Sequence, residues 1–349
     1  MKKNLIALAV LSLSGGAAMA QSSVTMYGLA DAGVGKIKAT AQDETFQQVG
    51  IGGVGTDGTN KTQFISGSRM NNSDSRVGVR GVEDLGGGLK AEFNFETGLD
   101  LDDGANTTAP NFWARYANVA LAGNWGTVKL GRQYNASYLV TTMYELTDTA
   151  NYSVLGNTYN YTGVGVRANS AFSYMTPTFN GFTAGIGYVN KNDSPPGTPS
   201  QQRLSAVDVG ALYADGPITV AASANKATHG KTAFQLGGKY NFGNFILAAS
   251  YNQGVVPGTH LIRRGFELGG TVKFGAFSAT LDLTRDTKNE WTLENFGRAQ
   301  AGLGAVGGRK YTNGLVELKY ALSKRTFLYG AYLRLDKTNN YGIGMLHTF

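Results

Sequence analysis

The chain ends on the stretch Tyr341-Gly-Ile-Gly-Met-Leu-His-Thr-Phe349, in which the character of the side chains alternates at every second position. Successive side chains of a β-strand point to opposite faces of the sheet, so a period of two predicts a strand. The bulkier face of this strand carries Tyr341, Ile343, Met345, His347 and Phe349. The sequence therefore closes on a strand with one largely apolar face.

The first twenty residues predict export. Lys2 and Lys3 precede an apolar run from Leu5 to Leu13, and small residues follow as far as Ala18-Met19-Ala20. This is the pattern of a secretory signal peptide over residues 1–20, so we expect the mature chain to begin at Gln21. No other segment approaches the roughly 20 apolar residues that a transmembrane helix needs. An exported chain of this kind can span a membrane only as a closed β-barrel.

Composition is consistent with one large β-domain over residues 21–349. Glycine is abundant (49 residues), proline is scarce (7), cysteine is absent, and no linker divides the chain. The net charge of +7 is dispersed. Without a basic run or an arginine-rich helix, nucleic acid is excluded as a partner. The scattered cations on loops and rims instead favour lipopolysaccharide, a cell-surface polyphosphate, as a binding partner.

Two kinds of connection divide the chain into strands. Short turns rich in Gly, Asn and Asp supply the backbone conformations of tight hairpins; they lie at 84–88, 123–126, 179–181, 215–217, 242–244, 274–276 and 322–324. Polar connections, most of them longer, lie near 38–62, 100–111, 133–166, 191–202, 227–231, 252–263, 287–310 and 337–340. These fifteen connections predict an all-β fold, a 16-stranded antiparallel transmembrane β-barrel with short turns at one rim and long loops at the other.

Alternation along the strands predicts which side chains face lipid. Leu318, Phe327 and Leu333 are expected to face lipid or a neighbouring subunit, whereas Glu317, Lys319 and Arg334 are expected to face the lumen. Charged side chains on the inner face do not suit a dry sandwich, but they suit a barrel with a wet interior. Aromatic residues gather beside the short turns, as in an interfacial girdle: Trp125, Phe179, Phe182, Tyr240, Phe242, Phe245, Phe274, Phe277 and Tyr320. Sixteen tilted strands enclose a backbone diameter of about 35 Å, which side chains alone cannot fill.

Four stretches, in this order and at this spacing, resemble the trimeric general-diffusion porins of Gram-negative outer membranes. They are Val24-Thr-Met-Tyr-Gly28 with Asp31, the hairpin from Ser75 to Lys90, Gly126-Thr-Val-Lys-Leu-Gly-Arg-Gln-Tyr134, and Arg167-Ala-Asn-Ser-Ala-Phe-Ser-Tyr174. The apolar C-terminal strand is also similar to the signal by which outer-membrane barrels are recognised and inserted. The resemblance covers the mature chain and implies a homotrimer in the outer membrane, a water-filled channel for small hydrophilic solutes and ions.

The resemblance further implies that the third loop, from Gln133 to about Val166, folds into the lumen and narrows it. Its carboxylates Glu145 and Asp148 would then face a ladder of wall arginines. The matching positions are Arg76, Arg132 and Arg167, with Arg80 nearby. Alternation with lipid-facing valines and aromatics supports an inward direction for Arg76, Arg80 and Arg167, but Arg132 would need a bulge at Gly131. The excess of arginine predicts a weak to moderate preference for anions.

Other signals are weaker. Asp100, Asp102 and Asp103 before Gly104 form a weak calcium candidate without a spaced ligand set. The three dispersed histidines offer no zinc site, and no cofactor or catalytic group is predicted, so the chain is not expected to be an enzyme.

Two alternatives to a general-diffusion channel stay open. One is a solute-specific channel that uses the tyrosines of the third loop: Tyr134, Tyr138, Tyr144, Tyr152, Tyr159 and Tyr161. The other is a surface-exposed structural or adhesion barrel. The small residues Gly28, Ala30, Ala32, Gly342 and Gly344 of the first and last strands are expected to allow close contact between the subunits of the trimer.

Overall fold

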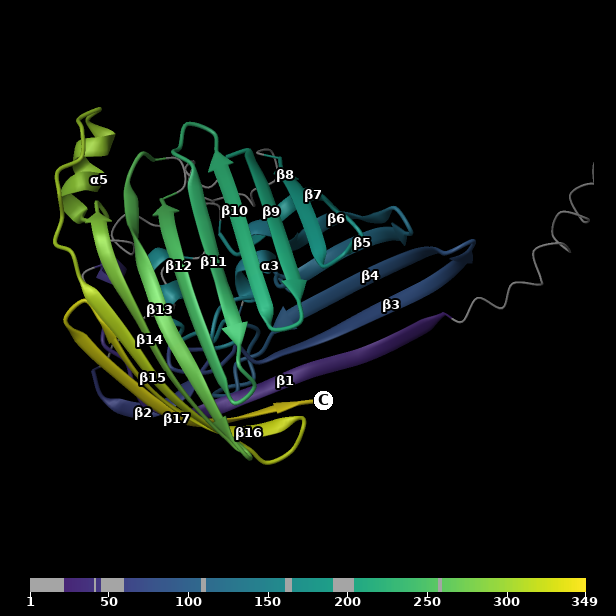
Figure 1. Cartoon of the computed structure of the whole chain (residues 1–349), viewed down its shortest axis with the longest axis horizontal. Coiled ribbons are helices and arrows are strands. Elements are labelled where there is room, and N and C mark those ends of the chain that lie inside the picture. The colour runs from purple at the N-terminus through teal and green to yellow at the C-terminus, as the bar shows by residue number, and fades with distance from the viewer. Residues whose placement is uncertain are drawn as a thin grey trace, which may run out of the picture.

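The structure is a computed structural model that describes residues 22–40, 42–44, 60–107, 111–160, 165–190, 204–256 and 259–349. The predicted signal peptide and the connection at 191–202 lie outside the described residues. Figure 1 shows the strands side by side in a strongly curved wall, with α3 against its inner side and α5 beyond one rim. No helix in the described ranges combines the length and the apolar character needed to cross a membrane.

Within the described residues, one antiparallel sheet contains all the strands: β1 (Ser23–Lys36), β2 (Thr62–Ser66), β3 (Arg76–Gly86), β4 (Leu89–Gly98), β5 (Tyr116–Gly123), β6 (Gly126–Tyr134), β7 (Arg167–Met175), β8 (Phe182–Val189), β9 (Ala206–Asp215), β10 (Ile218–Ala227), β11 (Ala233–Asn241), β12 (Phe245–Val255), β13 (Ile262–Phe274), β14 (Phe277–Asn289), β15 (Thr312–Ala321), β16 (Thr326–Leu335) and β17 (Thr338–Thr348). Helices in the described connections include α3 (Ala136–Thr142), α4 (Val154–Tyr159) and α5 (Leu293–Gln300).

The sheet closes because its first and last long strands pair with each other. β1 pairs with β17 from Leu29 opposite Thr348 to Lys36 opposite Tyr341. Gly28 and Phe349 exchange two backbone hydrogen bonds of 3.1 Å just beyond that ladder. Closure satisfies the backbone donors and acceptors that an open edge would expose. The predicted C-terminal strand, the closed antiparallel barrel and the short turns are confirmed. The predicted loop at 337–340 is wrong, because β17 begins at Thr338 and only residues 336–337 separate it from β16.

The short strand β2 was not predicted. The predicted connections left residues 63–83 as one strand, but β1 pairs with β2 through Ala32–Lys36 and with β3 through Ser23–Leu29. β2 and β3 therefore share one position in the wall, and sixteen strand positions encircle the described barrel. Residues 67–75, which we call the inner segment, leave the wall between them. Ser68, Arg69, Met70 and Asn71 of this segment are buried.

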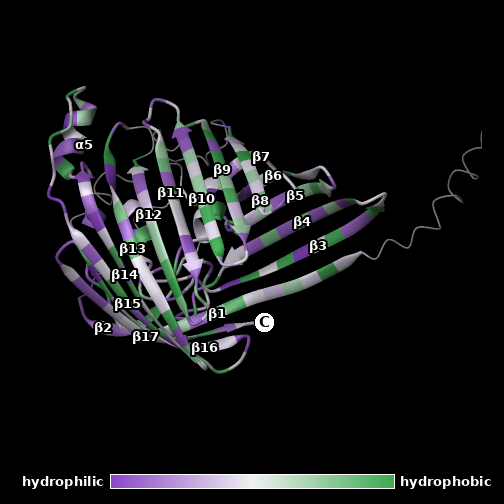
Figure 2. Cartoon of the chain, viewed as in Figure 1, coloured by the Kyte–Doolittle hydropathy of each residue, from purple (hydrophilic) through white to green (hydrophobic). Residues whose placement is uncertain are grey.

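Exposed apolar side chains cover the outside of the barrel. All nine aromatic residues predicted beside the short turns are exposed, as a lipid-facing girdle requires. Figure 2 shows hydrophobic and hydrophilic bands alternating along the strands. On β15, Leu318 is 57% exposed and Glu317 is buried, as alternation predicts.

The predicted register of β16 is wrong. Leu333 is fully buried and Phe327 packs against a buried cluster, whereas Arg334 is exposed on the outside. The cluster consists of Ile37, Ile65, Met70, Ala150, Tyr152, Val154, Leu315, Tyr329, Ala331, Leu333 and Leu335. The apolar face of β16 points inward because the inner segment and the third loop bring apolar side chains into the lumen.

The predicted role of two glycines is also wrong. Gly342 and Gly344 face the lumen rather than a neighbouring subunit. A Cβ atom on Gly342 would lie 3.0 Å from Met70 Cβ, and one on Gly344 would lie 2.4 Å from the hydroxyl of Tyr329. Both glycines leave room for side chains of the inner cluster. Gly28 does lie on the outer face, but there the ring of Phe349 covers it.

Candidate functional site

The third loop begins at the end of β6 and is anchored to the inner face of the far wall. The backbone N–H of Ser137, at the start of α3, donates to Asp208 Oδ2 of β9 (3.0 Å). The Asn225 Nδ2 of β10 donates to Ser137 Oγ (3.2 Å). Asp208 and Asn225 alternate with exposed outward residues, so these contacts place α3 inside the barrel.

A second set of contacts holds the far end of the loop. The Tyr152 hydroxyl donates to Glu317 Oε2 of β15 (2.7 Å) and accepts from Asn72 Nδ2 of the inner segment (2.7 Å). In α4, Thr158 Oγ1 lies 2.9 Å from Thr284 Oγ1 and accepts from Asn313 Nδ2 (2.9 Å). The loop is thus attached to β9 and β10 by α3 and to β14 and β15 by α4, so it crosses the lumen.

The inner segment meets the loop from the other side. Asn151 Nδ2 donates to Asp74 Oδ1 (2.8 Å) and to the carbonyl of Ser68 (3.0 Å). Asp31 of β1, fully buried, accepts from the backbone N–H of Ser73 (2.7 Å) and from the hydroxyl of Tyr329 (2.6 Å). These bonds fix the inner segment to the wall and narrow the space left beside the loop.

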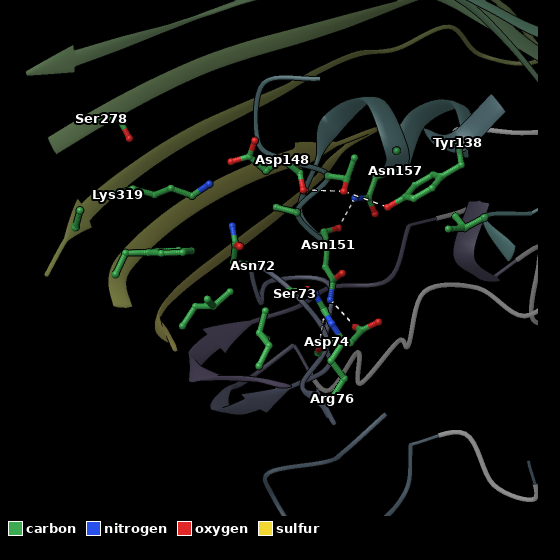
Figure 3. A pocket seen from close by; sticks show the side chains of 18 of the residues that line it. Asn72, Ser73, Asp74, Arg76, Tyr138, Asp148, Asn151, Asn157, Ser278 and Lys319 are labelled. Carbon is green, nitrogen blue, oxygen red and sulfur yellow. Dashed lines mark hydrogen bonds between the residues drawn. The ribbon is translucent and has the colours of Figure 1, made fainter. Parts of the chain in front are cut away.

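A cavity of about 670 Å³ remains between the loop and the wall, and it extends toward the short-turn rim. Wall, loop and inner segment all contribute to its lining. Figure 3 shows Asn151 of the loop between Asp148 on one side and Asp74 and Arg76 on the other. The charged side chains that line the cavity are Arg76, Arg115, Arg167, Lys273, Lys319, Asp74 and Asp148. Cations therefore outnumber carboxylates, five to two.

Two of these arginines are partly neutralised by acids. Arg115 pairs with Glu96 (Nε to Oε1, 2.7 Å) and with Asp74 (Nη1 to Oδ2, 2.9 Å). Arg76 lies 3.7 Å from Glu96 Oε2 and also donates to Ser73 Oγ (2.8 Å). Because Arg115 occupies both acids at short range, the charge of Arg76 is only weakly compensated.

Arg167 and Lys273 carry positive charge without a carboxylate partner. Within the described part of the chain, the ion pairs include neither residue. Arg167 donates to the hydroxyl of Tyr134 and stacks on its ring, with Cζ 4.3 Å from the ring centroid. Tyr138 packs on Tyr134 with ring centroids 4.7 Å apart, and burial raises the pKa of Tyr138 to about 12, so its phenol stays neutral. The cavity wall here is an immobilised cation stacked on an aromatic pair.

Three of the six predicted constriction residues line the cavity and three lie elsewhere. Arg76, Arg167 and Asp148 line it. Arg80 lies nearer the short-turn rim, 5.1 Å from the ring centroid of Tyr27. Arg132 donates to the carbonyl of Ala114 and to Asn169; a β-bulge follows Gly131, yet the side chain does not line the cavity.

Glu145 is buried, and its carboxylate binds groups of its own loop. Its carboxylate accepts from the backbone N–H groups of Thr147 (2.8 Å) and Thr149 (2.7 Å) and from the Thr147 hydroxyl (2.6 Å). It lines a smaller cavity together with Lys239, Lys273 and Lys319, and the last two also line the larger cavity. The acid thus shapes the loop that carries Asp148.

The weak calcium candidate forms an ordinary turn. Asp100 Oδ1 accepts from the backbone N–H of Asp102 (3.0 Å) and Asp103 Oδ1 accepts from that of Ala105 (2.7 Å). In the described ranges, no group of three or more acidic, histidine or cysteine side chains is arranged to hold a metal ion. These hydrogen bonds explain the carboxylates of Asp100 and Asp103 as turn-forming groups.

Of the five predicted ladder tyrosines that the structure describes, three are unavailable to a solute. Tyr144, Tyr152 and Tyr159 are buried in packed clusters, and Tyr161 lies outside the described residues. Only Tyr134 and Tyr138 of the predicted ladder line the cavity. Arg115 and Lys273 also line the cavity, and neither was among the predicted site residues. Alternation along β13 contained the signal for Lys273, because it shares parity with buried Glu267 and Thr271.

A family model described as Gram-negative porin matches residues 7–340. The chain belongs to the Gram-negative porin family. Outer membrane porin protein 32 of Delftia acidovorans is 36% identical over 361 residues, which cover 98% of this chain and 92% of that protein. An outer membrane porin protein of Bordetella pertussis is 29% identical over 410 residues, and the match covers 100% of both chains. Among solved structures, the anion-selective porin from Comamonas acidovorans has a TM-score of 0.68 at 24% identity, covering 94% of this porin and 100% of that chain. The barrel, its inner cavity and these relatives together make this porin an outer-membrane channel protein.

Proposed function

We propose that this porin is a general-diffusion channel for small hydrophilic solutes and ions, with a weak to moderate preference for anions. The observation that supports the preference is the pair Arg167 and Lys273, two cavity-lining cations without a carboxylate partner in the described part of the chain. Fixed charges along a pore bias permeation toward ions of opposite sign. In a wet pore two unit charges 4 Å apart interact by about 1 kcal/mol, so the bias is moderate.

The reversal potential across a planar bilayer in a salt gradient tests this proposal. The wild type should be anion-preferring, and the double variant Arg167→Gln with Lys273→Gln should move the reversal potential toward cations. Lys226→Gln, which removes an outward-facing cation of β10, is the matched control and should leave selectivity unchanged. The preference should weaken as salt rises, because the screening length is about 8 Å at physiological ionic strength. Cation selectivity of the wild type at low salt, or no shift in the double variant, contradicts the assignment.

A solute-specific channel receives less support. It would need an aromatic ladder along the lumen, and three loop tyrosines are buried in clusters instead. A linear rather than saturating dependence of flux on solute concentration is the expected result for general diffusion.

We also propose that the porin works as a homotrimer, after removal of residues 1–20, in contact with lipopolysaccharide. The family supports the trimer, and β1 presents the small side chains Ala30 and Ala32 on its outer face. Unboiled protein should migrate as a heat-labile oligomer, and N-terminal sequencing should begin at Gln21. A monomer by several sizing methods in mild detergent would rule out the trimer.

A further inference from the structure

The inner segment, residues 67–75, and the third loop meet along four hydrogen bonds that we call the seam. The backbone N–H of Asn151 donates to the carbonyl of Asn72 (3.1 Å). Asn151 Nδ2 donates to Asp74 Oδ1 (2.8 Å) and to the carbonyl of Ser68 (3.0 Å). Asn72 Nδ2 donates to the hydroxyl of Tyr152 (2.7 Å). The side chains of the two asparagines, which Figure 3 shows at the cavity, thus supply three of the four bonds.

The seam lies between the cavity and a dry part of the lumen. Asn72 and Asn151 line the cavity, whereas their near neighbours in the chain, Met70 and Tyr152, are fully buried in the inner cluster. Leu333 of β16 belongs to the same cluster, so apolar side chains fill the lumen from the seam to that part of the wall. The position of the seam therefore fixes one side of the cavity.

The inner segment holds its conformation through contacts with the wall and with itself. Asp31 of β1 is fully buried and accepts from the backbone N–H of Ser73 (2.7 Å) and from Asn71 Nδ2 (3.1 Å). Asn71 Oδ1 accepts in turn from the backbone N–H of Ser68 (2.9 Å). A buried polar network that is satisfied in this way rigidifies its segment. The third loop therefore closes against a fixed edge, and the seam decides how closely the two approach.

We propose that the inner segment is a second constriction element of the pore, and that Asn72 and Asn151 are the positioning residues through which it sets the size limit for solutes. The inference rests on the proposed general-diffusion function, because the same cavity conducts the solutes. It concerns the width of that cavity and not its charge, since both asparagines are neutral. Where the seam opens, the loop and the inner segment separate, and the cavity widens toward the inner cluster.

The asparagine side chains determine how often the seam opens. One net hydrogen bond shifts an equilibrium about fivefold, so the loss of three such bonds raises the open population about a hundredfold. The open seam should appear as a second, larger conductance level in single-channel records. Uncharged sugars should report the same change, because a trisaccharide that enters slowly through the wild type should enter faster through the widened pore in a liposome-swelling assay.

A pair of cysteines across the seam tests the proposal in the full mature porin. The chain contains no cysteine, and the hydrogen bond from the backbone N–H of Asn151 to the carbonyl of Asn72 places the two positions within reach of a disulfide. Oxidised N72C/N151C should keep the wild-type conductance and size limit, because the disulfide holds the seam closed. Reduction should raise the occupancy of the larger conductance level about a hundredfold and speed the entry of the trisaccharide.

The matched control is N72A/N151C, which loses the same side-chain bonds but has a single thiol. It should behave like the reduced pair with and without reductant, and the wild type should not respond to reductant. The reversal potential and the heat-dependent gel mobility should be unchanged in every variant, because no charge and no wall contact is altered. Asn151→Ala alone removes two of the bonds and should raise the open population about 25-fold, which decides the question if the cysteine pair does not fold.

Three results would each overturn the proposal. They are the absence of a disulfide in the folded pair, equal conductance and equal trisaccharide entry before and after reduction, and a widened pore in the oxidised pair. Saturating sugar flux through the wild type would instead contradict general diffusion. The two proposals therefore fail by different measurements.

Discussion

Replacing Leu333 by alanine tests the inward register of β16. Leu333 has an exposed fraction of 0% and packs in the inner cluster, whereas Leu318 of β15 is 57% exposed on the outer face. Leu→Ala at either position removes three carbon atoms that would otherwise transfer from water to an apolar environment. The loss of that transfer free energy is about 2.4 kcal/mol. In a close-packed interior a cavity adds to this loss, and the total reaches about 2.7–5.0 kcal/mol. Lipid chains are fluid and fill the gap at Leu318, so no cavity term arises there.

We therefore expect Leu333→Ala to lower the free energy of unfolding by about 4 kcal/mol and Leu318→Ala by about 2 kcal/mol. Urea titration of the porin folded into lipid vesicles measures both, provided that the slopes of the two variants agree. The chain contains no cysteine, so Leu333→Cys and Leu318→Cys can also be probed with a membrane-soluble thiol reagent. Only the cysteine at 318 should react. An equal or larger loss in Leu318→Ala, or rapid labelling at 333, would refute the inward register.

Three other substitutions follow from buried contacts, and the same urea titration measures them. Tyr152→Phe should cost about 1–3 kcal/mol, because it removes a donor from the buried carboxylate of Glu317; an unchanged midpoint would show that this bond does not hold the third loop. Gly344→Ala should destabilise the barrel, because the added Cβ would lie 2.4 Å from the hydroxyl of Tyr329. Gly330→Ala is the control and should be tolerated, because its Cβ would lie 3.5 Å from Cγ2 of Ile343. Equal stability of the two variants would contradict this prediction. Arg263→Ala should cost about 3–5 kcal/mol, since it leaves two buried aspartates without their shared partner, and a loss below about 1 kcal/mol would count against that pairing.

Much of the candidate site was predictable from alternation and resemblance, and the errors have physical causes. Arg76, Arg167 and Asp148 line the cavity, as the family pattern implied. Arg132 does not line it, because its guanidinium is taken up by polar groups of the wall beside the bulge. Glu145 was treated as a pore charge, but the backbone N–H groups of its own loop bind it. Local hydrogen bonds of this kind depend on a loop conformation that residue spacing does not encode.

Residue patterns alone predict the closed sheet, its short turns and the outer face of most strands. Those features depend on a period of two, on turn residues and on the contrast between lipid and water, which are local properties. The packing inside the lumen, in contrast, depends on contacts between segments that are distant in sequence. Phe327 and Leu333 face inward because the inner segment and the third loop, distant in sequence, bring Met70, Tyr152 and Val154 against them. Where a loop replaces water inside the barrel, the inner face of the wall becomes apolar, and alternation alone no longer distinguishes inside from outside.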